Sequence, residues 1–242
     1  MANELDELTG PVNAEGNDVN VIQKQIKVTV GTESMIFEYG VWIVGVLLGL
    51  LVYFTKDNIV LALILAVGPG GGFYYAKIQA RNYLLKLQQD IQSKASSIDN
   101  FLEQRVMILQ NVVGIVEKAV DLDKDVMKSV AAFRGGMNPN GENRNEFATN
   151  LDATFNNLIP HIEAYPDLQA HASIADAMRQ NSYLQKEITA ARELYNDTVL
   201  MWNTAIFEWP TKKIVAAKAG YSTRIPFSTS AAMKEQARGT FF

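Results

Sequence analysis

The sequence contains no cysteine and only two histidines, His161 and His171. Without cysteine the chain can form no disulfide and no thiolate metal site. Neither histidine has carboxylates at the spacing of a metal site, and no serine has the Gly-x-Ser-x-Gly setting of a nucleophile elbow. The net charge of −4 gives no concentrated basic footprint for nucleic acid. We therefore expect no metal, no cofactor, no nucleic-acid partner and no enzyme activity.

A long apolar block occupies residues 35–76. From Met35 to Phe54 the only charge is Glu38, and a second uncharged run follows from Ile59 to Ala76. About 20 apolar residues suffice to cross a bilayer, so the block predicts a membrane anchor. Either the first run spans once and the second lies at the interface, or both form a hairpin joined by residues 55–58. Length favours the hairpin, with Pro69 and the three glycines after it expected to kink or unwind the second helix.

The charges on either side of the block predict its orientation. Lys77, Arg81 and Lys86 follow it, and no acidic residue occurs before Asp90, so we expect the C-terminal domain in the cytoplasm. Residues 1–34 are acidic and lack the basic start of a secretory signal, which predicts a flexible leader. An alternating apolar pattern within residues 22–30 allows a short strand or a membrane-surface contact, although disorder fits the composition better. The leader lies outside the cell for one span and inside for two.

The chain beyond the block is patterned for long amphipathic helices. An apolar stripe from Leu84 to Val120 steps by about 3.6 residues and continues to Arg134. A second helix is predicted from about residue 145 to Tyr165-Pro166, a third over about 173–209, and a short one over 212–219. A break of the first helix at Gly114 gives a four-helix bundle, whereas an unbroken one gives a rod that would associate laterally. The prediction is all-α: an antiparallel up-and-down bundle of three to four long helices over residues 77–219, with a flexible tail over 220–242.

Several polar residues lie within or beside the apolar seams of these helices. Asn181 occupies a stripe position of the third helix. Others border the seams of the first and third helices: Asp99, Arg105, Arg192, Asn196 and Asn203. Buried polar groups need hydrogen-bond partners, so these residues predict an interhelical network that fixes the register of the helices. A ligand site made from the same groups is the alternative.

Three segments resemble motifs of the LemA family. Residues 97–109, with Asp99 and Arg105, resemble its Ile-Asp-x-x-Leu-x-x-Arg segment. Residues 163–170 resemble its Tyr-Pro-Asp-Leu turn through Tyr165 and Pro166. Residues 191–199 resemble its Ala-Arg-x-x-Tyr-Asn helix through Arg192, Tyr195 and Asn196, followed by Asn203 and Trp209-Pro210. The three motifs occur in the family's order over about residues 75–227.

The resemblance implies a bacterial protein with an N-terminal membrane anchor and an antiparallel helical bundle. No enzyme activity or catalytic residue is established for the family, and one relative is tied to the formation of bacterial intracellular membrane compartments. This chain differs in its longer acidic leader and second apolar run. We expect a self-associating, non-enzymatic scaffold in the cell membrane that organises the bilayer or recruits partners on its cytoplasmic face. A small-ligand sensor or an accessory subunit of a membrane complex is the alternative.

Overall fold

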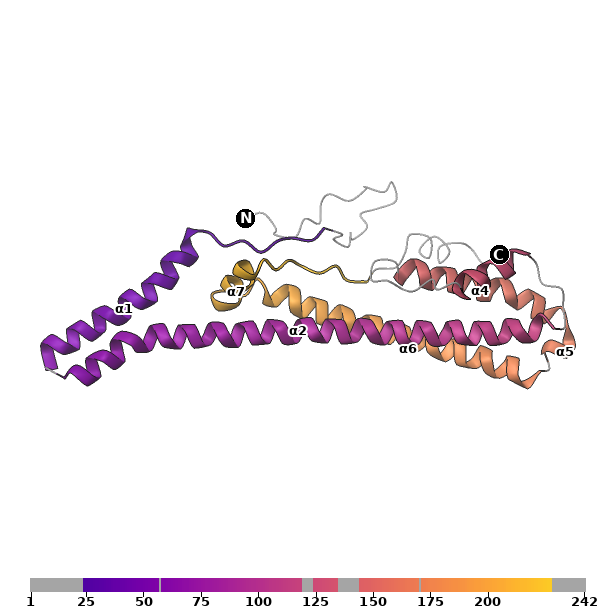
Figure 1. Cartoon of the computed structure of the whole chain (residues 1–242), viewed down its shortest axis with the longest axis horizontal. Coiled ribbons are helices and arrows are strands. Elements are labelled where there is room, and N and C mark those ends of the chain that lie inside the picture. Colours follow the sequence, from indigo (N-terminus) through magenta and orange to yellow (C-terminus); the bar gives the residue numbers. More distant parts are fainter. Residues whose placement is uncertain (1–23, 57, 119–123, 135–143, 170, 228–242) are drawn as a thin grey trace, which may run out of the picture. The chain divides into compact units, whose positions relative to one another are not determined.

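The computed structural model describes residues 24–56, 58–118, 124–134, 144–169 and 171–227. Within these residues the chain is almost entirely helical, and the only strand-like pairing is an isolated antiparallel bridge between Lys27 and Ser222 (Figure 1). This confirms the all-α fold class. The helices are α1 (Thr32–Lys56), α2 (Ile59–Val116), α3 (Lys124–Arg134), α4 (Arg144–Glu163), α5 (Pro166–Gln169), α6 (Ala172–Ala205) and α7 (Thr211–Ala219).

The apolar block forms two separate helices. α1 begins at Thr32 and ends at Lys56, and α2 begins at Ile59, so the interruption falls within the predicted link over residues 55–58. At the start of α2 the Asn58 Oδ1 accepts a hydrogen bond of 3.1 Å from the Leu61 N–H, as a helix-capping residue does. α2 continues without interruption through Pro69 and the glycines after it, so the expected unwinding is absent. Apolar helices of this kind tolerate a proline, since neighbouring groups compensate for the lost hydrogen bond.

The long amphipathic helix divides after Val116, two residues beyond the break considered at Gly114. A continuous helix to Arg134 is therefore wrong. Gly114 lies in the last turn of α2, and glycine within a helix is destabilising relative to other residues. Val130 and Phe133 of α3 nevertheless lie in the same core cluster as Val113 and Val116 of α2.

The remaining helices follow the predicted order with different ends. α4 keeps Pro160 inside it and ends at Glu163, and α5 forms directly after the Tyr165 turn. α6 ends at Ala205 rather than at Trp209. Its last turn is closed by tighter bonds, from the Phe207 N–H to the Thr204 carbonyl and from the Glu208 N–H to the Ala205 carbonyl, each 3.2 Å. α7 ends at Gly220, whose φ of 71° is a left-handed conformation that glycine adopts without strain.

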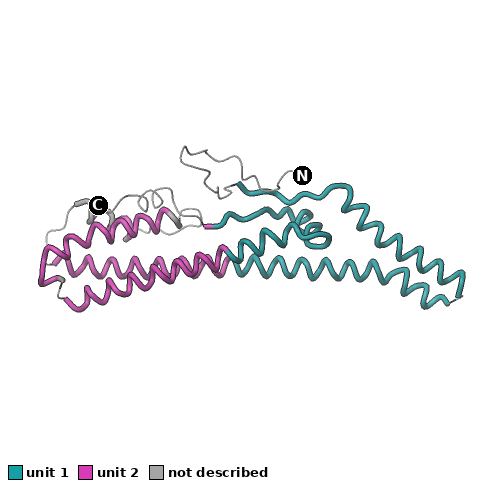
Figure 2. Tube along the Cα trace, turned by 180° about the vertical axis from the view of Figure 1, so that it is seen from behind, with its two compact units in different colours: residues 1–91, 197–226 teal, residues 92–196, 227–242 magenta. Residues whose placement is uncertain are grey.

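The chain divides into two compact units (Figure 2). One contains Met1–Ile91 and Asp197–Pro226, and the other contains Gln92–Asn196 and Phe227–Phe242. The second unit has a continuous hydrophobic core to which α2, α3, α4, α5 and α6 all contribute. The division falls within α2, after Ile91, so this one helix contributes to both units.

Residues on both sides of the helical region make backbone contacts within the first unit. The Val28 N–H donates to the Tyr221 carbonyl at 3.0 Å, and the Thr223 N–H donates to the Ile26 carbonyl at 2.9 Å. The Ile26 N–H donates to the Thr223 Oγ1 at 2.8 Å. The described part of the predicted leader therefore pairs as a short extended segment, whereas the composition favours disorder. Residues 1–23 and 228–242 lie outside the described residues.

Candidate functional sites

The first candidate site is the pair of apolar helices α1 and α2. Both are long and apolar enough to cross a membrane, and only 11% of the residues in either apolar window are buried. A Cβ atom built on Gly45 would lie 2.7 Å from the Ala66 carbonyl oxygen, and one on Gly49 would lie 2.6 Å from the Ala62 carbonyl oxygen. Glycines four residues apart on α1 thus lie against alanines four residues apart on α2. Small residues at this spacing allow close backbone approach between membrane helices.

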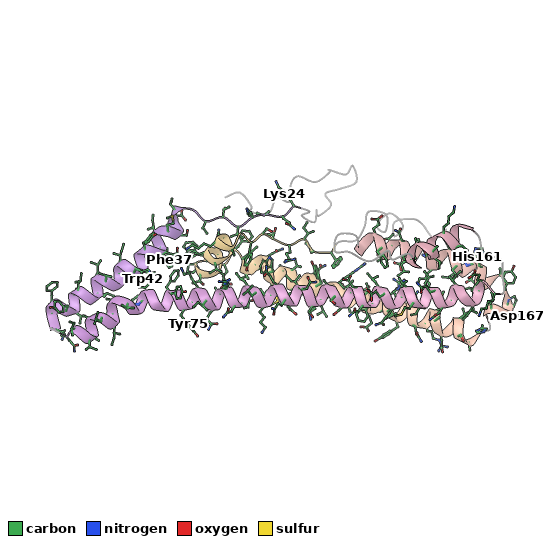
Figure 3. The ribbon with its side chains drawn as sticks, viewed as in Figure 1. Lys24, Phe37, Trp42, Tyr75, His161 and Asp167 are labelled. Atoms are coloured by element: carbon green, nitrogen blue, oxygen red, sulfur yellow. The ribbon has the colours of Figure 1, made fainter. Side chains whose placement is uncertain are left out.

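The contacts between α1 and α2 have an antiparallel order. As the position on α1 advances from Glu38 to Gly49, its partner on α2 falls back from Lys77 to Ala62. The Phe37 ring also lies 5.6 Å from that of Phe73. Figure 3 shows Phe37 toward the end of α1 that is opposite to the link. The outward-facing side chains are large and apolar; Phe54 is 80% exposed. This is the arrangement of a helical hairpin with an apolar exterior.

Glu38, the single charge in the first apolar run, connects three helices. One carboxylate oxygen forms an ion pair of 2.6 Å with the Lys77 Nζ of α2, and the other forms an ion pair of 2.6 Å with the Lys218 Nζ of α7. The Glu38 side chain is 17% exposed, so its charge is partly shielded from water. A carboxylate in such a setting is stable when it is paired. Sequence reasoning noted Glu38 but could not find its partners, because they lie 39 and 180 positions away.

The second candidate site is a buried polar network in the second unit. The Arg105 side chain is 2% exposed. Its Nε donates to the Asn181 Oδ1 at 2.8 Å, and its Nη2 donates to the Asp152 Oδ1 at 2.6 Å. The Gln185 Nε2 donates to the same oxygen at 3.0 Å. The network joins α2, α4 and α6. It contains the predicted Arg105 and Asn181, while Asp152 and Gln185 were missed because they lie among ordinary polar residues of their helices.

Arg192 of α6 has a different environment. Its Nε is buried and has no hydrogen-bond partner among the described residues, and its guanidinium carbon lies 5.7 Å from the centroid of the Phe227 ring. Burial lowers the pKa of the Arg192 guanidinium, the nearby Asp152 charge raises it, and the positive charge of Arg105 lowers it. Arginine remains charged at neutral pH despite such a shift. Arg192 therefore places a positive charge beside an aromatic ring, a favourable cation–π geometry.

Two predicted asparagines of α6 bind the backbone that follows α7. The Asn196 Nδ2 donates to the Phe227 carbonyl at 3.0 Å, and the Phe227 N–H donates to the Asn196 Oδ1 at 2.7 Å. Asn203 makes the same pair with Arg224, at 2.9 and 2.8 Å. Seven helical residues span about 10.5 Å, and three extended residues span about 10 Å. The spacing of the asparagines therefore matches that of their partners.

Aromatic side chains add to this binding. The Trp202 Nε1 donates to the Ser222 carbonyl at 2.9 Å, and the Tyr195 ring lies 4.8 Å from the Phe227 ring in an edge-to-face arrangement. Residues 222–227 are thus held on α6 at several points, although the sequence assigned them to a flexible tail. The sequence does not indicate this binding, because the asparagine side chains bind backbone N–H and carbonyl groups, which do not depend on the identity of the tail residues.

We predict that Asn196→Ala exposes the tail to protease. The change leaves the Phe227 backbone N–H and carbonyl without partners in a partly buried place, which costs about 1–3 kcal/mol. Asn203→Ala, at a more exposed pair, costs about 0.5–1.5 kcal/mol. Trypsin cleavage after Arg224, followed by mass spectrometry, should be several-fold faster in both variants. Gln180→Ala, an exposed change on the same helix, is the control. Unchanged cleavage in Asn196→Ala would show that the asparagines do not hold the tail.

Tyr165, Pro166 and Asp99 complete the set of predicted residues. Tyr165 is 46% exposed, and it forms with the exposed Pro166 the turn that leads into α5. Asp99 is half-buried on α2, six residues before Arg105. His161 is half-buried and His171 is exposed. Among the described residues, no group of three or more His, Cys, Asp or Glu side chains is placed to hold a metal ion.

Comparison with known proteins gives one finding on identity. The model of the LemA family matches residues 94–241, more than half of the chain. No curated protein matches the sequence. The matched region contains Arg105, Arg192, Tyr195, Asn196 and Asn203, the residues that carried the resemblance in the sequence and that make the contacts described above. The chain belongs to the LemA family.

Proposed function

We propose that this protein is a non-enzymatic helical scaffold that is anchored in the cell membrane by the α1–α2 hairpin. The observation that carries the proposal is the hairpin itself: two apolar helices in contact through Gly45, Gly49 and two alanines, with large apolar side chains facing outward. An apolar exterior of this extent is stable in lipid and unfavourable in water. α2 then continues as one helix into the bundle, which fixes the bundle at the bilayer.

The backbone pairing outside the hairpin supports two spans rather than one. Ile26 and Val28, before α1, pair with Thr223 and Tyr221, after α7. Such pairing requires the leader and the end of the bundle to lie on the same side of the membrane. Lys77, Arg81 and Lys86 then favour the cytoplasm as that side.

A role as a scaffold is supported by how the polar residues are used. Arg105 binds Asn181 and Asp152, and Asn196 binds the backbone of Phe227, so these groups hold the protein together. A small-ligand sensor that used the same groups would have to break these bonds. The ligand-binding alternative therefore has less support than the structural one.

Self-association is supported by exposed apolar residues on α6. Tyr183 is 62% exposed and Leu194 is 52% exposed. Eleven residues of helix turn through about three full turns, so the two side chains lie on one face. We propose that this face contacts a second copy of the chain, and that the assembled bundles recruit partners or organise the bilayer.

The proposal is tested by fractionation and crosslinking of the full chain in bacterial membranes. We expect the protein to stay in the membrane after an alkaline carbonate wash and to give crosslinked dimers or higher species with an amine-reactive reagent. Leu194→Glu should reduce the crosslinked fraction several-fold, whereas Ser182→Glu, an exposed polar position about 120° away around the same helix, should not. Release by carbonate would contradict the anchor, and a strict monomer at all reagent concentrations would contradict self-association.

A further inference from the structure

A groove lies beside the Glu38 ion pairs. It has a volume of about 390 Å³ and lies between α2 and α7. Three of its lining residues are cationic, Lys77 and Arg81 of α2 and Lys218 of α7, and two are tyrosines, Tyr74 and Tyr221. All of these residues belong to the first compact unit. The groove takes no part in the network around Arg105 or in the binding of residues 224–227.

The charges around the groove leave an excess of positive charge. Glu38 accepts ion pairs from both Lys77 and Lys218, and so neutralises one of the two. Among the described residues, no carboxylate lies within ion-pair distance of Arg81, which is exposed. The lysines are held in place by Glu38, while the guanidinium of Arg81 has its fork of donors available. That combination of two lysines and an arginine suits an anionic ligand with several oxygens.

The position of the groove in the chain limits what that ligand is. Lys77 is the first charged residue after the uncharged run from Ile59 to Ala76. In a membrane-spanning hairpin this residue lies at the level of the lipid headgroups, as does Tyr74 just before it. Basic pockets at the cytoplasmic end of membrane helices bind the headgroups of anionic lipids, and tyrosines are enriched at the same level.

We propose that this groove binds the phosphate group of an anionic phospholipid. The inference rests on the hairpin anchor proposed above. Arg81 donates two hydrogen bonds to the phosphate oxygens, and the ammonium groups of Lys77 and Lys218 neutralise its charge. A bound headgroup contacts α2 and α7 together and so stabilises the contact between the anchor and the bundle. Free inorganic phosphate offers the same oxygens, and the experiment must separate the two sources.

The test uses the full chain purified in a neutral detergent. Phosphatidylglycerol and phosphatidylcholine are titrated separately, and bound lipid is counted by native mass spectrometry. We expect saturable binding of phosphatidylglycerol and at least fivefold weaker binding of phosphatidylcholine. Arg81→Gln should weaken phosphatidylglycerol binding about tenfold, the loss expected for charge-assisted hydrogen bonds. Lys86→Gln removes the same charge five residues further along α2, pointing about 140° away, and should change binding less than twofold.

Three outcomes overturn the inference. Equal losses in Arg81→Gln and Lys86→Gln would show a diffuse attraction to basic charge. Equal binding of both lipids would show no site for an anionic headgroup. Millimolar inorganic phosphate that displaces the lipid completely would assign the groove to free phosphate. Resistance of each variant to a carbonate wash is measured in parallel. A protein that stays in the membrane but binds both lipids equally refutes the lipid site without contradicting the membrane anchor.

Discussion

Arg105→Met is expected to lower the free energy of unfolding of the bundle by about 3 kcal/mol. The substitution keeps the length of the side chain but removes both donors at a place that is 2% exposed. The buried Asn181 Oδ1 then has no donor, and the Asp152 carboxylate loses its cation. Asp152 is 29% exposed, so water solvates part of its charge, which places the loss near the lower end of the range for broken buried pairs.

The loss is measured as urea-induced loss of helical circular dichroism in the full chain. In thermal unfolding it corresponds to a decrease of about 6–12 °C in Tm. Arg179→Met is the matched control, because the Arg179 side chain is 80% exposed and forms an ion pair with Asp176 on its own helix; it should change stability by less than about 0.5 kcal/mol. Adding Asn181→Leu to Arg105→Met should recover part of the loss, since replacing both partners leaves fewer orphaned groups. Equal stability of Arg105→Met and wild type would refute the structural role of the network.

Gly49→Leu is expected to separate α1 from α2. A Cβ atom at residue 49 would lie 2.6 Å from the Ala62 carbonyl oxygen and 2.8 Å from the Ala66 Cβ, and neither atom belongs to a flexible side chain. The helices must therefore move apart to admit any side chain. Overpacking of this kind costs about 1–3 kcal/mol or more, enough to disrupt a contact based on small residues.

Because the chain has no native cysteine, the separation can be followed by thiol crosslinking. A protein with Phe37→Cys and Phe73→Cys, whose native rings lie 5.6 Å apart, should crosslink rapidly with a short bis-maleimide. Gly49→Leu should slow that reaction at least fivefold. Gly40→Leu on the same helix, where a Cβ atom meets nothing within 4 Å, should leave it unchanged. Equal slowing by both substitutions would show that α1 responds to side-chain volume in general and not to a contact at Gly49.

The helices themselves could be predicted from the sequence, because an apolar period of about 3.6 residues is a local signal. The period predicts the all-α class and the separate short helix α7, and the polar residues between the two apolar runs predict the link over residues 55–58. The place where the long helix divides could not be fixed. The apolar pattern continues through Val130 and Phe133 although α2 ends at Val116, so the periodic signal alone does not mark the break.

The candidate sites could be predicted in part. Asn181 and Arg105 stood out because polar residues at or beside an apolar seam require partners. Asp152 did not, since an acidic residue on a helix resembles any solvated position. The contacts of the tail could not be predicted, because the asparagines that bind it recognise the backbone of Arg224 and Phe227, and backbone groups give no sequence signal. The pairing of Glu38 with Lys218 spans 180 positions and also leaves no local trace.

Thiol labelling of single cysteines in cells distinguishes the α1–α2 hairpin from a single membrane span. Lys24→Cys, Lys56→Cys and Arg179→Cys place one thiol before α1, one at the link and one in the bundle. With a membrane-impermeant maleimide and an intact inner membrane, we expect labelling at residue 56 alone, and labelling at residues 24 and 179 only after the membrane is permeabilised. Labelling of residue 24 in intact cells while residue 179 stays protected would contradict the hairpin and establish a single span.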